Sequence, residues 1–450
     1  MRPVRRIHTI GRGTRAWAVL LTGLVAGGRA WALDPVLPTS QYVLDRWDWA
    51  RGFPEETITD ITQTPDGILW IAHADGLLRF NGSTAVRSPW PASDVMDRSM
   101  RRIAVDPQGA LWGMTATGSV VRIPADARHP PEGTPVQVIA ARNPARRVPP
   151  GRWAILPSRD RVRAGSPGGM EELSIGPLPV APASLKVTPL GEQIAIALGA
   201  DESVWTASAD GKLERRQPDG GSQLIATFPL GPIGRMAVGR NGRLWIRARG
   251  LLLCWCEGRL RSWPLPNGFA SSSSYEPVIE DAHGAVWVGG RGGVLRLRHG
   301  RFDLVKLALD LDETPVTALH EDREGALWMG TLTGELLRLR DSPVVSYGRA
   351  EGLAGDAVNS ILLEASGDVW THSMNRGLTH WQAEKRRTIR FESGSLFYAA
   401  RDRASGSLVV GSGRTRWRVD RDRPIPLKDP FAEQAGRISG WWVHPANGQA

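Results

Sequence analysis

The chain has 450 residues, a formal net charge of +10, 19 Trp, 51 Gly, 33 Pro and 2 Cys. Apolar residues make up 41% and charged residues 23%, which excludes a wholly disordered chain. Because single cores stop growing near ~250–300 residues, we expect a modular fold or several domains. Two Cys cannot supply a disulfide framework or a structural zinc cage.

The beginning of the chain carries much of the positive charge. Residues 1–32 contain six Arg and no acidic residue, then an apolar stretch (16–28) and the small-x-small sequence Ala30-Trp31-Ala32. This order predicts a signal peptide cleaved near Ala32, and therefore an exported, periplasmic protein. The apolar stretch is shorter than the ~20 residues of a membrane-spanning helix. The remainder holds 50 basic and 46 acidic residues, a net charge of +4, which gives no reason to expect a nucleic-acid partner.

One internal repeat dominates the rest of the sequence. Its core is a turn residue, Gly, any residue, an aliphatic residue and Trp, as in PDGILW (65–70) and REGALW (323–328). Successive copies lie 40–42 residues apart, with Trp153 as a degenerate copy in the divergent segment 128–195. The Trp residues assigned to this repeat are Trp70, Trp112, Trp205, Trp245, Trp287, Trp328 and Trp370.

Each repeat also predicts the same strands. An alternating strand precedes the turn, as in TITDITQ (57–63), and a second Gly opens another strand, as in DGLLRF (75–80). Four antiparallel strands in ~40–45 residues make one propeller blade. No unit has the 3.6-residue apolar period of a helical solenoid. The predicted fold is therefore an all-β propeller with the repeated Trp packed between blades.

The residues of the first repeat carry a family resemblance. RWDWARGFPEETITDITQTPDGILWIAHADGLLRFNG (46–82) resembles the opening blade of two-component regulator propellers, the exported sensor regions of bacterial signalling receptors. A second opening segment of this kind begins at Arg349, and Trp370 follows Trp70 by 300 residues. At 41–43 residues per blade, we predict a seven-bladed propeller over 41–349 and the first blades of a second, truncated propeller over 350–450.

The resemblance implies a non-catalytic, ligand-sensing region of a transmembrane receptor. Its output module, a hybrid histidine kinase or a diguanylate cyclase, would follow a downstream membrane helix. The chain stops one residue before the next expected Trp, so we interpret it as an amino-terminal fragment. The resemblance also implies a small molecule or oligosaccharide as ligand, no cofactor, and a homodimer for the full-length receptor.

Two local patterns concern closure and the cysteines. Residues 41–48 (QYVLDRWD) and 344–348 (VVSYG) are competing candidates for the strand that completes the last blade of the first ring. Cys254 and Cys256 face the same side of a strand, but a disulfide between them would be strained, so we expect two thiols.

No metal site is predicted, because the nine His are scattered and no HExxH is present. In a propeller, the loop between the second and third strands shares one mouth of the ring with the connection that leads into each blade. Arg and Asn there can donate to carboxylated or hydroxyl-rich ligands. The ligand-binding candidates at this mouth are Arg51, Glu55, His73, Asp75, Arg247, Arg249, Arg291, Asn375 and Arg376.

The alternative function is an exported propeller lyase. GPIGRMAVGRNGRLWIRARG (231–250) is similar to a blade of streptogramin lyases, which work with a metal, His and Glu near the ring mouth. That function requires paired His at the mouth. His73 and His372 would meet this requirement only if the whole chain closed as one larger ring.

Overall fold

The structure is a computed structural model, and it describes two compact units, Met1–Ser342 and Pro343–Ala450. The predicted signal peptide, residues 1–32, lies outside the described residues. The described residues are 33–34, 37–89, 98–125, 136–140, 154–157, 161–166, 169–174, 186–188, 193–199, 201–208, 210–227, 233–248, 250–269, 276–307, 309–342, 347–349, 351–355, 357–364, 366–373, 377–382, 385–391, 398–402, 406–412, 415–420 and 422–427.

The described residues of the first unit form seven four-stranded antiparallel sheets, and the all-β fold is as predicted. The first three sheets contain β2 (Ile58–Gln63), β3 (Leu69–His73), β4 (Gly76–Phe80), β5 (Ala85–Arg87); β6 (Met100–Val105), β7 (Leu111–Thr115), β8 (Val120–Ile123), β9 (Gln137–Ala140); β10 (Ala154–Pro157), β11 (Arg161–Ser166), β12 (Gly169–Ser174), β13 (Lys186–Thr188).

The next three sheets continue the same order. They contain β14 (Gln193–Leu198), β15 (Val204–Ser208), β16 (Lys212–Arg216), β17 (Ser222–Thr227); β18 (Ile233–Val238), β19 (Leu244–Ala248), β20 (Leu251–Cys256), β21 (Arg259–Pro264); β22 (Val278–Glu280), β23 (Val286–Gly290), β24 (Gly293–Arg298), β25 (Arg301–Lys306). The seventh sheet has β26 (Val316–Glu321), β27 (Leu327–Thr331), β28 (Leu336–Asp341) and the early strand β1 (Tyr42–Trp47).

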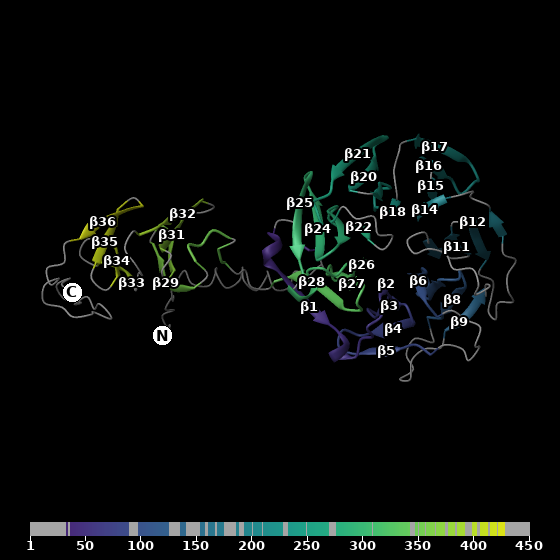
Figure 1. Ribbon diagram of the computed structural model, residues 1–450, viewed down its shortest axis with the longest axis horizontal. Coiled ribbons are helices and arrows are strands. Elements are labelled where there is room, and N and C mark those ends of the chain that lie inside the picture. The colour runs from purple at the N-terminus through teal and green to yellow at the C-terminus, as the bar shows by residue number, and fades with distance from the viewer. Residues whose placement is uncertain are drawn as a thin grey trace, which may run out of the picture. The chain divides into compact units, whose positions relative to one another are not determined.

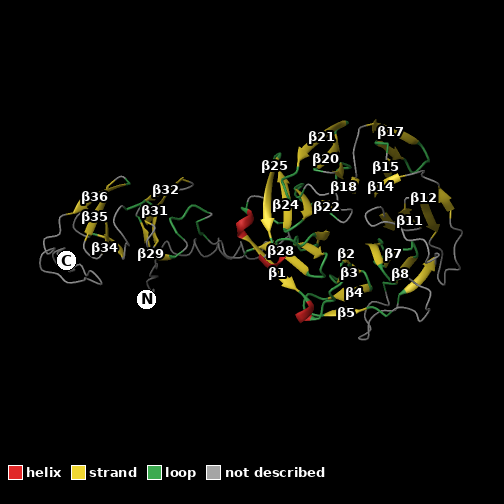
Figure 2. Ribbon diagram, in the orientation of Figure 1, coloured by secondary structure: helices red, strands yellow, loops and turns green. Residues whose placement is uncertain are grey.

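The seven sheets are the blades of a closed ring. The first strand of each sheet lies nearest the axis (Figure 1), and these inner strands contact one another in sequence from β2 through β6, β10, β14, β18 and β22 to β26. The ring closes because β26 also contacts β2. Helical structure in the described chain is limited to three 3-10 turns, Thr39–Gln41, Trp49–Arg51 and Leu309–Leu311 (Figure 2).

Strand β1 completes the seventh blade by pairing with β28, from Tyr42 opposite Asp341 to Trp47 opposite Leu336. Of the two candidate segments, 41–48 therefore takes the closing position. Asp45 accepts hydrogen bonds from Arg338 (2.7 Å) and Arg340 (2.9 Å), both on β28. These charge-assisted contacts tie the first strand of the ring to the last.

The described part of the second unit contains two further four-stranded sheets. Their strands are β29 (Val358–Leu363), β30 (Val369–Ser373), β31 (Gly377–Gln382), β32 (Lys385–Ile389); β33 (Tyr398–Arg401), β34 (Leu408–Ser412), β35 (Thr415–Asp420), β36 (Arg423–Leu427).

The seven repeat Trp side chains are at most 5% exposed. In four sheets a carboxylate six residues earlier accepts the indole N–H: Asp106 for Trp112, Asp281 for Trp287, Asp322 for Trp328 and Glu364 for Trp370, at 2.6–2.8 Å. The aspartates also accept a backbone N–H of the turn, as from Ala110 to Asp106 (2.7 Å). One aspartate carboxylate therefore accepts the N–H of a buried indole and also a backbone N–H that closes the turn.

The third blade departs from the expected register. Trp153, interpreted as the degenerate repeat Trp, lies outside the described residues and precedes β10, the first strand of its blade. The second strand of each other blade of the ring carries the repeat Trp, but the second strand of this blade is β11, Arg161–Ser166, which contains no Trp. The 41-residue spacing from Trp112 therefore matched the repeat without marking the equivalent position.

Candidate functional site

The predicted mouth of the ring is formed as expected. Thr57, in the connection into the first blade, donates a hydrogen bond to the carbonyl of Leu332 (2.8 Å), in the loop between β27 and β28. The N–H of Leu332 in turn donates to the carbonyl of Pro315 (3.0 Å), just before β26. The loops between second and third strands thus share one end of the ring with the connections that lead into the blades.

His73 and Asp75 occupy this end of the first blade. His73 is fully buried, and its Nδ1 accepts the backbone N–H of Asp75 (3.2 Å). Burial, with a contribution from Arg87, lowers the pKa of His73 to about 4, so the ring is neutral at neutral pH. Asp75 is exposed and pairs with Arg87 (2.5 Å), which also lies 3.7 Å from Glu56.

Arg247 and Arg291 hold connections between blades. Arg247 is only 1% exposed, pairs with the equally buried Glu276 (2.6 Å) and donates to the carbonyl of Phe269. Arg291 is exposed and lies 3.3 Å from Glu313. Both acids belong to the connection that leads into the following blade. Arg247 is thereby placed to position that connection, whereas Arg291 faces solvent.

The remaining candidates divide between the rim and the undescribed residues. Arg51 and Glu55 are exposed, and Arg51 donates to the carbonyl of Arg46 (2.7 Å). Beside them Trp49 is 70% exposed, a feature that the sequence signals only as a Trp of the opening segment outside the repeat motif. Arg249, Asn375 and Arg376 lie outside the described residues.

A second group of charges, not anticipated from the sequence, lies on the inner strands. Asp60 on β2 lies 4.0 Å from Arg102 on β6 and accepts the backbone N–H of Ile103 (3.1 Å). Burial raises the pKa of Asp60 and lowers that of His320 on β26 to about 4. Arg235 on β18 donates to the carbonyl of Thr59 (3.4 Å), which joins the fifth blade to the first. Asp60 and Arg102 belong to consecutive blades, whereas His320 and Arg235 reach the first blade only because the ring closes.

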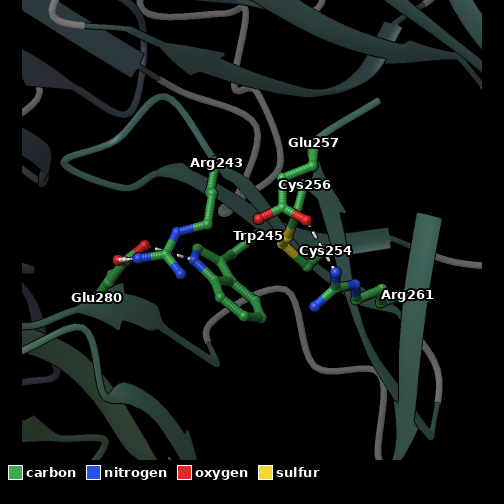
Figure 3. The surroundings of a disulfide bond; sticks show 7 residues. All are labelled: Arg243, Trp245, Cys254, Cys256, Glu257, Arg261 and Glu280. Carbon is green, nitrogen blue, oxygen red and sulfur yellow. Dashed lines mark hydrogen bonds and ion pairs between the residues drawn. A yellow bond between two sulfur atoms is a disulfide. The ribbon is translucent and has the colours of Figure 1, made fainter. Parts of the chain in front are cut away.

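The structure corrects the expectation for the two cysteines, because Cys254 and Cys256 form a disulfide on β20. Their Cα atoms are 5.6 Å apart, and the alternation of the strand directs both side chains toward the same side. Figure 3 shows the disulfide near Trp245, with Arg243 and Trp245 both directed at Glu280. The two sulfurs lie in the core between the fifth and sixth blades.

The described residues contain no group of three or more His, Cys, Asp or Glu arranged to hold a metal ion. Within the same residues, no helix is long and apolar enough to cross a bilayer. His73 belongs to the first unit and His372 to the second. The chemistry that the described mouth offers is an exposed indole, guanidinium groups and carboxylates, which suit recognition of a polar ligand.

The repeat is recognisable by comparison with known families. Residues 310–333 match the model of the family described as two component regulator propeller, so the resemblance seen in the first repeat is confirmed in another part of the chain. No curated protein matches the chain.

Solved structures share the fold at low sequence identity. The extracellular domain of a hybrid two component system from B. thetaiotaomicron has 14% identity and a TM-score of 0.54 over 88% of this chain and 61% of its own. Virginiamycin B lyase from Staphylococcus aureus has 14% identity and a TM-score of 0.52 over 66% of this chain and 99% of its own. A streptogramin B lyase structure has 14% identity and a TM-score of 0.53, covering 68% and 100%. The chain thus spans less than two thirds of the two-component structure but nearly the whole of each lyase.

Proposed function

We propose that this chain is the exported, non-catalytic sensing region of a bacterial signalling receptor. The match of residues 310–333 to the two component regulator propeller model carries the proposal. The extracellular domain from B. thetaiotaomicron, which shares the fold over 88% of this chain, supports the same setting. The output module and its membrane helix belong to this proposal as parts of a longer receptor.

Residues 33 and 34, directly after the predicted cleavage site, are docked on the ring. Leu33 is 4% exposed and packs in a core cluster with residues of the sixth and seventh blades. The backbone N–H of Asp34 donates to both carboxylate oxygens of Asp341 at 3.1 Å. Cleavage near Ala32 would therefore leave a short end that is already docked on the ring.

The ligand of this sensor is proposed to be an oligosaccharide or another small polar molecule at the mouth. Trp49 offers an exposed flat surface, and Arg51 and Arg291 offer exposed planar donors. Arg247 has a different role in this proposal, because its buried pair with Glu276 positions a connection rather than facing a ligand.

A glycan array probed with the purified chain tests the proposal. We expect binding to a restricted set of glycans, and a loss of about tenfold or more in affinity for Trp49→Ala and for Arg51→Gln. Arg259→Gln, an exposed change on the outer strand β21, is the matched control and should bind as the parent does. Cleavage of streptogramin B by the purified chain would contradict the non-catalytic role and favour the lyase alternative.

A further inference from the structure

A second regularity of the blades involves the strand that follows each repeat Trp. The residue directly opposite Trp on this strand is Arg in five sheets and His in one. The pairs are Trp70–Arg79, Trp112–Arg122, Trp205–Arg215, Trp287–Arg296, Trp328–Arg338 and Trp370–His380. In four of them the guanidinium lies 5.2–6.0 Å from the indole, a cation–π distance. His380 stacks on Trp370 at 3.9 Å.

The fifth blade breaks this rule. Trp245 lies opposite Cys254, whose short side chain is bonded to Cys256. The carboxylate that accepts the indole N–H is also exceptional, because it comes from Glu280 of the sixth blade (2.8 Å). The position six residues before Trp245 is Gly239, where an added Cβ would lie 1.9 Å from Glu280 Oε2. The sixth blade thus supplies the acid that four of the other sheets carry themselves.

A pocket of about 460 Å³ lies beside Trp245 and Cys256, in the blade where Cys254 replaces the Arg of the other blades. Its walls come from turns of the fifth blade (Arg243, Glu257) and of the sixth blade (His283, Arg298). These turns join first to second and third to fourth strands, so they lie at the end of the ring opposite the mouth. The pocket is therefore separate from the proposed sensing site.

The lining combines two aromatic rings with an excess of positive charge. The Trp245 and Trp263 ring centroids are 5.7 Å apart with an interplanar angle of 38°. Three Arg stand against Glu257 in the lining and Glu280, which pairs with Arg243, a net charge of +1 when the histidines are counted as neutral. That balance disfavours a cationic ligand and favours an anion.

Two of these arginines retain donors for a ligand. Arg243 pairs with Glu280, and Arg261 pairs with Glu257 (2.9 Å), but each guanidinium has five N–H groups. Among the described residues, the buried Nε of Arg243 has no hydrogen-bond partner. The Arg261 side chain is 56% exposed, so a ligand can reach it from solvent.

We propose that this pocket binds a small anion with a carboxylate attached to a six-membered ring that has an apolar face, either an aromatic plane or the C–H face of a sugar. The ring lies against the indoles of Trp245 and Trp263, and the carboxylate accepts hydrogen bonds from Arg243 and Arg261. An aromatic acid and an acidic sugar both present this chemistry.

Isothermal titration calorimetry of the whole chain at low ionic strength tests this site with two acids and their neutral counterparts. Benzoate and benzamide form the aromatic pair, and glucuronate and methyl glucoside form the sugar pair. We expect at least one acid to bind about tenfold or more tightly than its neutral counterpart, with an affinity that falls as salt is added. Binding of benzoate would identify the ligand class as aromatic acids, and binding of glucuronate would identify it as acidic sugars. Failure of both acids to bind at millimolar concentration overturns the proposal, as does a result in which neither acid binds more tightly than its neutral partner.

Variants locate the site. Arg261→Gln should weaken binding of the acid about tenfold or more, whereas Arg259→Gln, exposed on the same strand but outside the pocket, should not. Cys254→Arg restores the residue of the other blades and should abolish binding by filling the pocket. If Cys254→Arg fails to fold, Arg261→Gln still decides the matter. Equal losses from the Arg261 and Arg259 changes would overturn the assignment. None of these three substitutions lies at the mouth, so glycan binding there should be unchanged.

Discussion

The first blade of the ring and the first blade of the second unit have similar opening segments but different surroundings. Four apolar positions recur 300 residues later: Trp47, Phe53, Ile58 and Ile61 become Tyr347, Leu353, Val358 and Ile361. In the ring these four side chains are at most 7% exposed, in a cluster with Trp328 and Leu336 of the seventh blade. In the second unit Ile361 is 68% and Tyr347 52% exposed. They border an apolar groove of about 510 Å³ with Trp381.

The difference separates two contributions to blade stability. Turn chemistry and alternating strands are local, so both opening segments lead into a four-stranded sheet. Leu353 is still 7% exposed in the second unit, so burial at that position is local, whereas burial at the other three positions depends on the neighbouring blade. The exposed face of β29 is the kind of apolar surface that promotes association.

The largest expected effect is at Trp328, which fills the junction of the first and seventh blades. Its ring centroid lies 5.4 Å from Trp47 and 5.9 Å from Phe80. Trp328→Ala should lower the unfolding free energy of the first unit by about 3–5 kcal/mol, because it leaves a cavity in a dry core. Trp381→Ala, in the half-covered groove, should lower that of the second unit by less than about 2 kcal/mol. Hydrogen exchange in urea, followed on peptides from each unit, measures both. Equal losses would show that the two opening segments are equally covered.

The pair Ile61→Ala and Ile361→Ala compares the same residue type in the two surroundings. Ile61 is 3% exposed, and its truncation should cost about 2–5 kcal/mol. Truncation of Ile361 should change stability by no more than about 0.5 kcal/mol. The midpoint of thermal unfolding of each unit reports the result. A large loss for Ile361→Ala would mean that its face is covered in solution.

Acid should destabilise the first unit through its buried histidines. The pKa of His73 and of His320 is lowered to about 4, whereas unfolding returns each to about 6.5. As the pH falls below about 6.5, the unfolded chain takes up protons that the native ring does not. Stability is therefore lost until about pH 4, by up to about 3 kcal/mol for each His. The raised pKa of Asp60, which faces His320, partly offsets this loss.

Unfolding free energies between pH 4 and 7.5 measure this dependence. His73→Asn with His320→Gln should flatten the curve, while exposed His299→Asn should leave its slope unchanged. A slope that survives the double change would place the responsible groups elsewhere.

A loss of intermediate size is expected at the closing strand. Burial acts to raise the pKa of Asp45, but hydrogen bonds from Arg340 and Arg338 outweigh it and hold this pKa below its usual value. Asp45→Asn should therefore cost about 1–2 kcal/mol at neutral pH, a penalty that disappears as the pH falls below about 4. Protease resistance of β1 measures this, with exposed Asp420→Asn as control. An unchanged cleavage rate would mean that backbone pairing alone holds the strand.

The regular parts of the fold were predictable because a local pattern encodes them. The turn Gly adopts the left-handed conformation, as at Gly67 (φ 84°) and Gly325 (φ 84°), and the spacing of the Trp residues marks the blades. The third blade was misjudged at Trp153 because it lacks that pattern. The carboxylate six residues before Trp is visible in the sequence, but its role as acceptor of the indole N–H becomes clear only in the structure.

The mouth was predictable only in outline. Topology places His73 and Arg247 at the ends of second strands and Asp75 and Arg291 in the loops that follow, but exposure depends on partners far away in the chain. Arg247 is buried because Glu276 follows 29 residues later, and Asp60 meets His320 only after the ring has closed. The disulfide was not predictable because two residues on one side of a strand can equally remain thiols, and only the structure shows Cys254 and Cys256 joined.

The pairing of β1 with β28 has a kinetic consequence. Tyr42 and Asp341 are partners although 299 residues separate them, so the ring cannot be completed until almost the whole first unit is available. Closing such a long loop makes folding slow. Under the proposed export, a chain that emerges with its amino terminus first must leave β1 without its partner strand throughout emergence. Chaperones that shield this segment would therefore raise the yield of folded protein, and a circular permutant that joins β1 directly after β28 should fold faster.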